Sequence, residues 1–145
     1  MLIIAGHCAP HERERLESLS ENNNNISIFP YFVSDRETPL FFTAADAFVV
    51  PFSIVLTSGS VILSLSYGLP VIAPAAGCLP ELLARGGGTL YNPDSQTLSA
   101  AMAHIKSLNR DKLHHQAVAI AAGLSWEKTA EKTARVYHRL VQGSN

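Results

Sequence analysis

The sequence predicts an α/β protein in which a parallel sheet carries helices on both faces. Up to residue 108, five short apolar or β-branched runs alternate with segments of helical length. The runs are apolar throughout and do not alternate with polar residues, as expected for strands covered on both faces. This succession is typical of a doubly wound, Rossmann-like parallel sheet with flanking helices.

The expected elements follow the chain in a regular order. The first strand is Leu-Ile-Ile-Ala-Gly at 2–6, and a helix is expected at 11–20. A run of four asparagines at 22–25 forms the next turn, because Asn tolerates the left-handed backbone that a turn can require. Further strands are expected at 26–29, 47–51, 70–74 and 88–91, with helices at 37–45, 60–68, 79–84 and 95–108.

The last part of the chain is predicted to be wholly helical, with helices at 111–123 and 125–142. Ser125 suits an N-cap, and Glu127 lies in the first turn, where the helix dipole favours a carboxylate. The apolar positions of this helix recur with helical spacing, so that one stripe is expected to pack against something. The stripe consists of Trp126, Ala130, Thr133, Ala134, Tyr137, Leu140 and Val141.

Length and composition set limits on the function. The 145 residues fit one domain, 1–145, that buries a real core, and 47% of them are hydrophobic. The formal charge of −1 and the mixed charges predict neither a nucleic-acid partner nor an anionic membrane surface. No apolar run reaches the about 18 residues of a membrane span, so a cytoplasmic protein is expected. The two cysteines, Cys8 and Cys78, form no CxxC pair and are expected to be reduced.

A polar cluster stands between the strand at 47–51 and the helix at 60–68. It consists of Thr57, Ser58, Gly59, Ser60 and Val61. At the carboxyl end of a strand, glycine allows a phosphate to approach the backbone, the helix N-terminus offers N–H groups, and the hydroxyls donate further hydrogen bonds. An N-cap serine beside a turn glycine explains the same residues, and both interpretations stay open.

A second loop follows the strand at 70–74. It places Gly77 and Cys78 before a short helix with Glu81 near its start. Gly77 would give a ligand access to the backbone, and Glu81 would accept hydrogen bonds from ligand hydroxyls. A first-turn carboxylate that only stabilises the helix is the alternative, and the local pattern does not separate the two.

Other reactive residues indicate no site. His7, Cys8 and His11 share one loop but lack a fourth ligand, so no metal site is expected there. His114 and His115 are expected to be exposed on a helix. The glycine-rich segment 85–91 precedes a strand, which is the reverse of the order found in phosphate-binding loops, and it has no GK[ST]. No GxGxxG follows a strand, which disfavours a dinucleotide site.

Several segments together resemble a known family. "LIIAG", "TAADAFVVPF", "YGLPVIAPAAGCLPEL", "GTLYNP" and the helix from "SWEK" resemble, in order and spacing, the C-terminal, nucleotide-sugar-binding domain of GT-B glycosyltransferases of group 1, family four. The resemblance covers nearly the whole chain. It implies retaining, metal-independent hexosyl transfer from a UDP- or GDP-linked donor, in a cleft between two Rossmann-like domains. It also implies a role in polysaccharide biosynthesis and no cofactor besides the donor substrate.

The resemblance assigns roles to some of these residues. The amides of Ser58–Val61 would hold the donor diphosphate, and the nucleobase would lie near Phe32, Val33 and Ser34. The family usually carries two glutamates around this helix, but Val55 and Leu63 occupy those positions here. No catalytic carboxylate can therefore be assigned.

The resemblance also implies missing parts. A complete enzyme has an N-terminal acceptor domain and an initial strand and helix whose loop supplies an Arg and Lys pair. The expectation is a cut or truncated chain, or one half of an enzyme whose N-terminal domain is supplied in trans. A non-catalytic nucleotide-binding module and an interaction subunit are the alternative functions. A peripheral position at the inner membrane face is compatible with the complete enzyme.

Overall fold

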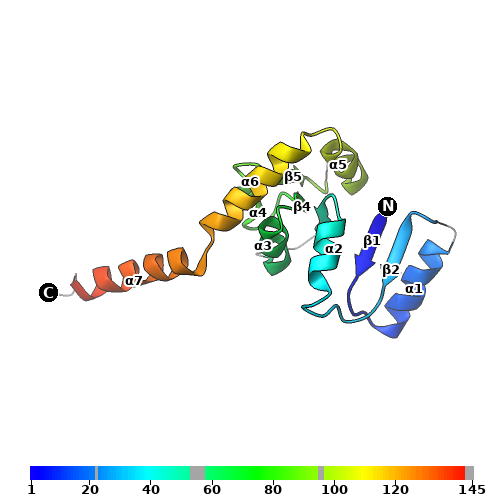
Figure 1. The fold of residues 1–145 in the computed structure, drawn as a ribbon, viewed down its shortest axis with the longest axis horizontal. Coiled ribbons are helices and arrows are strands. Elements are labelled where there is room, and N and C mark those ends of the chain that lie inside the picture. Colours follow the sequence, from blue (N-terminus) through cyan, green and yellow to red (C-terminus); the bar gives the residue numbers. More distant parts are fainter. Residues whose placement is uncertain (22, 53–57, 95–96, 143–145) are drawn as a thin grey trace. The chain divides into compact units, whose positions relative to one another are not determined.

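The computed structural model describes residues 1–21, 23–52, 58–94 and 97–142. Strands and helices alternate as far as the fifth strand, and the remaining elements are helices (Figure 1). Their order is β1 (Leu2–Ala5), α1 (Pro10–Ser20), β2 (Ile26–Phe29), α2 (Thr38–Ala44), β3 (Phe48–Val49), α3 (Gly59–Ser66), β4 (Val71–Pro74), α4 (Leu79–Leu82), β5 (Gly88–Tyr91), α5 (Leu98–Ile105), α6 (Arg110–Gly123) and α7 (Trp126–Gln142).

The strands are parallel, which confirms the predicted α/β class, but they form two sheets. One sheet has the order β1-β2, and the other has the order β3-β4-β5. The expected single sheet of five strands is therefore not seen among the described residues. Within the described residues, the backbone of β1 forms ladder hydrogen bonds with β2 alone, and the backbone of β3 forms them with β4 alone, so no ladder joins β1 to β3.

The chain divides into two compact units, Met1–Phe41 and Phe42–Asn145. In the first unit, α1 begins with proline at its first turn, and the Glu12 carboxylate accepts a hydrogen bond from the Ala9 N–H at 3.2 Å. The Phe29 ring meets the Phe41 ring edge-on at 5.2 Å. None of the described residues of this unit is buried, so its core is thin.

The second unit contains the core, which lies on both faces of the three-stranded sheet. Val71 and Ala73 of β4 pack with α3 and α6 in one cluster, whereas Ile72 packs with α5 in another. Successive strand side chains point to opposite faces, and both faces here are covered. The covering explains the uninterrupted apolar character of the strand sequence.

Helix α7 has the predicted amphipathic sequence but buries none of its residues. Its Trp126 side chain is 86% exposed, and Tyr137 and Val141 are exposed as well. Figure 1 shows α7 as the last, red helix, which leads to the C-terminus. Within the part of the chain that the structure describes, the expected apolar stripe is thus open to solvent.

A single methyl group at Gly88 is expected to destabilise the second unit by about 3 kcal/mol. A Cβ at this β5 position would collide with the carbonyl oxygen of Val71 on β4. Both groups belong to the central strand pairing, so the backbone would have to shift. Urea denaturation of the Gly88→Ala variant measures the loss.

Gly123→Ala is the matched control. A Cβ at Gly123, the last residue of α6, has no neighbouring atom within 4 Å. Alanine also has a higher helix propensity than glycine, so this variant should be as stable as the wild type or up to about 1 kcal/mol more stable. Equal stability of both variants would contradict the assigned β4-β5 pairing.

Candidate functional site

The Ser58–Val61 loop forms the N-terminus of α3. Ser58 has an extended backbone with φ −144°, and its Oγ accepts a hydrogen bond from the Val61 N–H at 3.4 Å. Gly59 and Ser60 are the first residues of the helix, and both are exposed. Helix geometry leaves first-turn N–H groups without intrahelical acceptors, and they carry the positive end of the dipole. The capping role of Ser58 and an anion-binding role are both compatible with this geometry.

The space beside Gly59 is open. Among the described residues, a Cβ placed there would find no atom within 4 Å apart from its own chain neighbours and helix backbone. Packing within the described residues therefore does not require a glycine at this position. Thr57 and Val55 lie outside the described residues, so the predicted role of Thr57 stays a prediction.

Burial of α3 explains why this part of the sequence has almost no charge. Val61, Ser64 and Leu65 are fully buried, and the Ser64 Oγ donates to the Leu69 carbonyl at 3.0 Å. Leu63, which occupies a glutamate position of the family resemblance, is 40% exposed. A leucine side chain offers no hydrogen bond to a sugar hydroxyl.

The second predicted loop lies at the same sheet edge. Because β3 and β4 are parallel, their carboxyl ends lie at the same edge of the three-stranded sheet. The Ala75 N–H donates to the Tyr91 carbonyl of β5 at 2.8 Å, which ties the start of this loop to the sheet. Gly77 adopts φ 58°, a left-handed conformation that favours glycine. The loop therefore has a fixed entry and a turn specified by its glycine.

Cys78 and Glu81 belong to the short helix that follows. Cys78 occupies the N-cap position without a side-chain hydrogen bond to the helix. Glu81 lies in the first turn and is exposed. Val61 near the start of α3 and Leu79 at the start of α4 belong to one core cluster with β4, so the starts of both helices lie against the three-stranded sheet.

The predicted nucleobase segment belongs to the first unit. Phe32 follows β2 and its side chain is 76% exposed, whereas Val33 and Ser34 are half-buried. The Glu37 carboxylate accepts hydrogen bonds from the Ser34 Oγ at 2.6 Å and from the Ser34 N–H at 3.0 Å. The Ser34 hydroxyl and N–H are thereby used in the turn that starts α2. Of this segment, only Phe32 and Val33 are free of these hydrogen bonds to Glu37.

Glu37 was not singled out by the sequence reasoning, although its signal was readable. Ser-Asp-Arg-Glu at 34–37 has the spacing of a capping box. The hydrogen bonds from the Ser34 hydroxyl and then the Ser34 N–H hold the pKa of Glu37 below its ordinary value. This carboxylate is consequently ionised down to lower pH than a free glutamate.

Glu37→Gln is expected to remove part of the pH dependence of stability. A folded-state pKa below the unfolded value stabilises the fold above the unfolded pKa, and the contribution is lost as the pH falls through the folded pKa. The variant should be less stable than the wild type near neutral pH and match it in acid. Urea denaturation at neutral pH and in acid measures the free energy of unfolding of the variant and of the wild type. Glu14→Gln, which changes an exposed carboxylate of α1, is the control.

A cavity of about 170 Å³ lies at the carboxyl ends of β1 and β2. Cys8 and His7 contribute to its wall, together with apolar residues of β1, β2 and α1. No group of three His, Cys, Asp or Glu side chains in the described ranges has a metal-binding arrangement. The metal independence expected from the resemblance stays a prediction.

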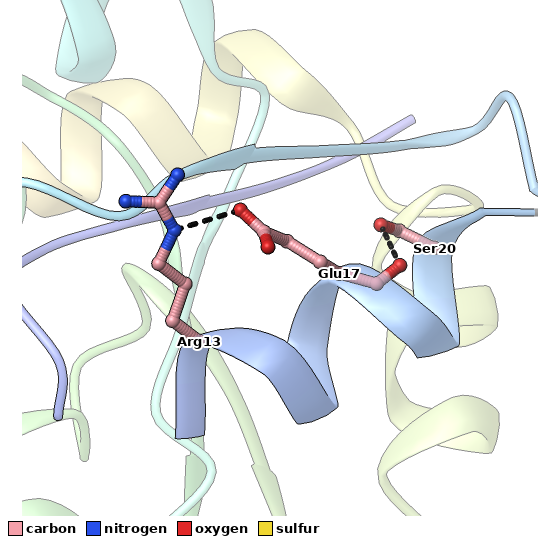
Figure 2. A network of polar contacts seen from close by, with 3 residues as sticks. All are labelled: Arg13, Glu17 and Ser20. Atoms are coloured by element: carbon pink, nitrogen blue, oxygen red, sulfur yellow. Dashed lines mark hydrogen bonds and ion pairs between the residues drawn. The ribbon is translucent and has the colours of Figure 1, made fainter. Parts of the chain in front are cut away.

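Arg13 on α1 is held by its own helix. Figure 2 shows its Nε paired with the Glu17 carboxylate at 2.8 Å, and the Ser20 Oγ donating to the Glu17 carbonyl at 2.9 Å. Arg13 and Glu17 are about half exposed, so the pair contributes little to stability. The pair marks a solvated helix face and indicates no anion site.

A comparison with protein families matches residues 1–107 to the family described as Glycosyl transferases group 1. The match includes the first unit and the second unit as far as α5, with both predicted loops, and ends before α6. The chain belongs to the group 1 glycosyltransferases. No curated protein matches it.

Solved glycosyltransferases have the same fold. A sucrose-phosphate synthase from Thermosynechococcus elongatus superposes with a TM-score of 0.76 at 24% identity, over 98% of this chain and 39% of its own. The catalytic domain of starch synthase IV from Arabidopsis thaliana, bound to ADP and acarbose, gives 0.67 at 17% identity, over 92% of this chain and 31% of its own. AviGT4, a glycosyltransferase involved in avilamycin A biosynthesis, superposes with a TM-score of 0.60 at 20% identity, over 98% of this chain and 44% of its own.

These matches confirm a Rossmann-like α/β fold of the GT-B glycosyltransferases. The chain spans less than half the length of each matched structure. None of the helices within the described residues has both the length and the apolar character needed to cross a bilayer.

Proposed function

We propose that this chain binds the diphosphate of a nucleotide-sugar donor at the N-terminus of α3, as part of a group 1 glycosyltransferase. The observation that carries the proposal is the open, glycine-led start of α3 at the carboxyl edge of a parallel sheet. Ligands of open α/β sheets bind at this edge, and helix N-termini attract phosphate. The starch synthase structure, which has the same fold, contains the nucleoside diphosphate ADP.

The residues of the loop would share the binding of the phosphates. The Gly59 and Ser60 N–H groups would donate to phosphate oxygens. The Ser58 Oγ accepts from Val61, which leaves its O–H proton for a phosphate. These N–H groups, the Ser58 hydroxyl and the helix dipole would bind the phosphates without a metal ion. UDP- and GDP-hexoses are the proposed donors, with no further cofactor.

The other predicted residues would hold the rest of the donor. Gly77 exposes its backbone beside the same edge, and Glu81 offers a carboxylate to sugar hydroxyls. The contact of Phe32 and Val33 with a nucleobase stays a prediction of the resemblance, and the Phe32 ring is exposed. Such a site would hold the leaving diphosphate during transfer of the sugar with retention of configuration.

A second candidate function rests on a separate observation. The apolar stripe of α7 is exposed along the whole helix, which favours an interaction subunit that docks on an acceptor domain. Its partner would be the N-terminal half of a glycosyltransferase. Donor binding and docking are compatible, because the helix and the loop are different surfaces.

Ser58→Ala is expected to weaken nucleotide-diphosphate affinity by about 0.5–1.5 kcal/mol, through the loss of one neutral hydrogen bond. Calorimetric titration with UDP, GDP and ADP measures it, and the proposed function requires that at least one of them binds. Ser66→Ala is the control. Its Oγ donates to the Leu63 carbonyl at 2.7 Å near the other end of α3, so its loss should leave affinity unchanged. Equal effects of both variants would contradict a site at the N-terminus.

A further inference from the structure

Helix α7 combines its exposed apolar stripe with an uneven distribution of charge. The helix contains four of the eleven Lys and Arg residues of the chain, but only two of the twelve Asp and Glu residues. It is therefore net positive, whereas the rest of the chain is net negative. The formal charge of −1 for the whole sequence does not reveal this separation.

The cations of α7 form one row along the helix. The row consists of Lys128, Lys132, Arg135 and Arg139. Their spacing of four, three and four residues places them on one face of the helix. All four residues are exposed, and none of them forms an ion pair with a carboxylate of the described residues. Positive charge on this face is thus not neutralised within the part of the chain that the structure describes.

Three members of the row enclose a hollow on the surface. Lys132, Arg135 and Arg139 line it together with Val136, and its volume is about 300 Å³. The fourth cation is held elsewhere, because the Lys128 Nζ donates to the Ala122 carbonyl at 3.0 Å. An anionic group can therefore approach three cations at once.

The row lies directly beside the apolar stripe. Val136, which is 56% exposed, stands one turn from Lys132 and continues the stripe toward the cations. Glu127 and Glu131 stand one turn apart on the other flank of the polar face, toward Ala134. Charges of opposite sign are thus separated across the polar face, and the positive flank borders apolar side chains.

Two aromatic residues belong to the stripe. Trp126 and Tyr137 are separated by about three helical turns, so they project from the same face. They are 86% and 66% exposed. Tryptophan and tyrosine rings are enriched at the level of lipid headgroups, where one part of the ring is in an apolar environment and the other in water.

We propose that α7 binds the surface of an anionic lipid bilayer and lies in the plane of that surface. The apolar stripe would enter the boundary between headgroups and acyl chains. Lys132, Arg135 and Arg139 would contact anionic headgroups. Charge complementarity supports this occupant, because the cations border the stripe and no described carboxylate pairs with them.

The bilayer and an acceptor domain are different occupants of the same stripe. The second candidate function explains the apolar residues of α7, but it does not account for the row of cations beside them. The membrane proposal is also independent of the donor site at the start of α3. Nucleotide binding and vesicle binding can therefore succeed or fail separately.

The fluorescence of Trp126 tests the proposal, because this residue is the only tryptophan of the chain. Its exposed ring should emit at long wavelength in buffer. Vesicles of equal parts phosphatidylglycerol and phosphatidylcholine should shift the emission to shorter wavelength. Vesicles of phosphatidylcholine alone should bind at least about tenfold more weakly. Absence of the shift with anionic vesicles, or equal affinity for both kinds of vesicle, would overturn the proposal.

The triple variant Lys132→Gln, Arg135→Gln and Arg139→Gln removes the cations of the hollow and keeps the tryptophan and the apolar stripe. Glutamine has a helix propensity close to that of lysine and arginine, and the three positions are exposed, so the fold should be retained. Affinity for anionic vesicles should fall at least about tenfold. Circular dichroism checks that α7 remains helical.

A second triple variant is the matched control. Arg15→Gln, Arg36→Gln and Lys106→Gln remove the same charge from exposed positions outside α7. This variant should bind anionic vesicles with the affinity of the wild type. Equal losses in the two triple variants would overturn the proposal, since the net charge of the chain, and not the row on α7, would then determine binding.

Tyr137→Gln tests the apolar stripe while Trp126 still reports on binding. Its affinity for anionic vesicles should fall severalfold, because less apolar area enters the bilayer. Wild-type affinity in this variant would overturn the proposed insertion of the stripe. So would a wild-type chain that is dimeric by light scattering and already emits at short wavelength without vesicles, since a second copy would then cover α7.

Discussion

Gly59→Val should abolish nucleotide-diphosphate binding while the chain remains folded. A valine side chain would fill the space beside the start of α3, where no atom of the described ranges lies within 4 Å of a Cβ, apart from its own chain neighbours and helix backbone. A phosphate could then no longer reach the Gly59 and Ser60 N–H groups. A fall in affinity of at least about a hundredfold, or about 2.8 kcal/mol, is expected.

Because no described residue crowds Gly59, the substitution should change ligand binding without changing the stability of the fold. The glycine is the first residue of α3 and does not have a left-handed backbone, so a substitution strains neither its conformation nor its packing. Circular dichroism and the urea midpoint should stay close to those of the wild type, and titration with UDP, GDP and ADP measures the loss. Gly59→Ala, with a smaller side chain, should give an intermediate affinity. Wild-type affinity in folded Gly59→Val would place the site elsewhere.

Local features of this fold could be predicted because local sequence determines them. The runs at 2–6 and 70–74 became β1 and β4 within one residue at each end. The helix at 60–68 starts one residue early, at Gly59, with Ser58 as its cap. β-branched runs and capping residues act through their own backbone, so neighbouring residues suffice to predict them.

Features that depend on distant residues could not be predicted. The division into two sheets depends on which strand edges meet, and no local pattern encodes that for β1 and β3. Strand β3 is also shorter than the run at 47–51, since Pro51 has no N–H group to donate to a ladder. The spacing of the apolar residues in α7 predicted an amphipathic helix correctly, but periodicity does not identify what covers it.

Some features of the candidate site could likewise be predicted from local sequence, and others could not. An N-cap serine in this loop, one of its two open interpretations, and a turn at Gly77 could be predicted from residue type and order, whereas the left-handed backbone of Gly77 was not predicted. The hydrogen bonds between Ser34 and Glu37 were not predicted, because Ser34 was assigned to the nucleobase from the family resemblance alone. A hydroxyl near a helix start should first be tested against the residue three positions later.

The 145-residue chain alone is expected to transfer no sugar to an acceptor. Transfer requires an acceptor hydroxyl held in line with the donor carbon, a positioning effect of about 7–11 kcal/mol. In the resemblance, the residues that position the acceptor belong to another domain, and this chain spans 39% of the sucrose-phosphate synthase structure. Slow hydrolysis of the donor is the most that the chain should catalyse.

The departing diphosphate would also be weakly stabilised. Residues 47–84, which include both loops of the candidate site, contain no Lys or Arg. Two negative phosphates would face N–H groups, hydroxyls and a helix dipole, and a dipole contributes only about 0.3–1 kcal/mol at an exposed terminus. A basic pair from another segment would add charge-assisted hydrogen bonds, which are about twice as strong as neutral ones. Donor affinity should therefore rise when that segment is present.

An assay with radiolabelled UDP- and GDP-hexoses separates these contributions. The purified chain should release at most free sugar, and transfer should appear only when a polypeptide carrying the acceptor domain and its basic loop is added. The Gly59→Val variant is the control in the two-component assay, because it removes the diphosphate site and should abolish the restored transfer. Robust transfer by the chain alone would show that it positions an acceptor itself. Restored transfer that survives Gly59→Val would show that the added polypeptide, and not α3, binds the donor.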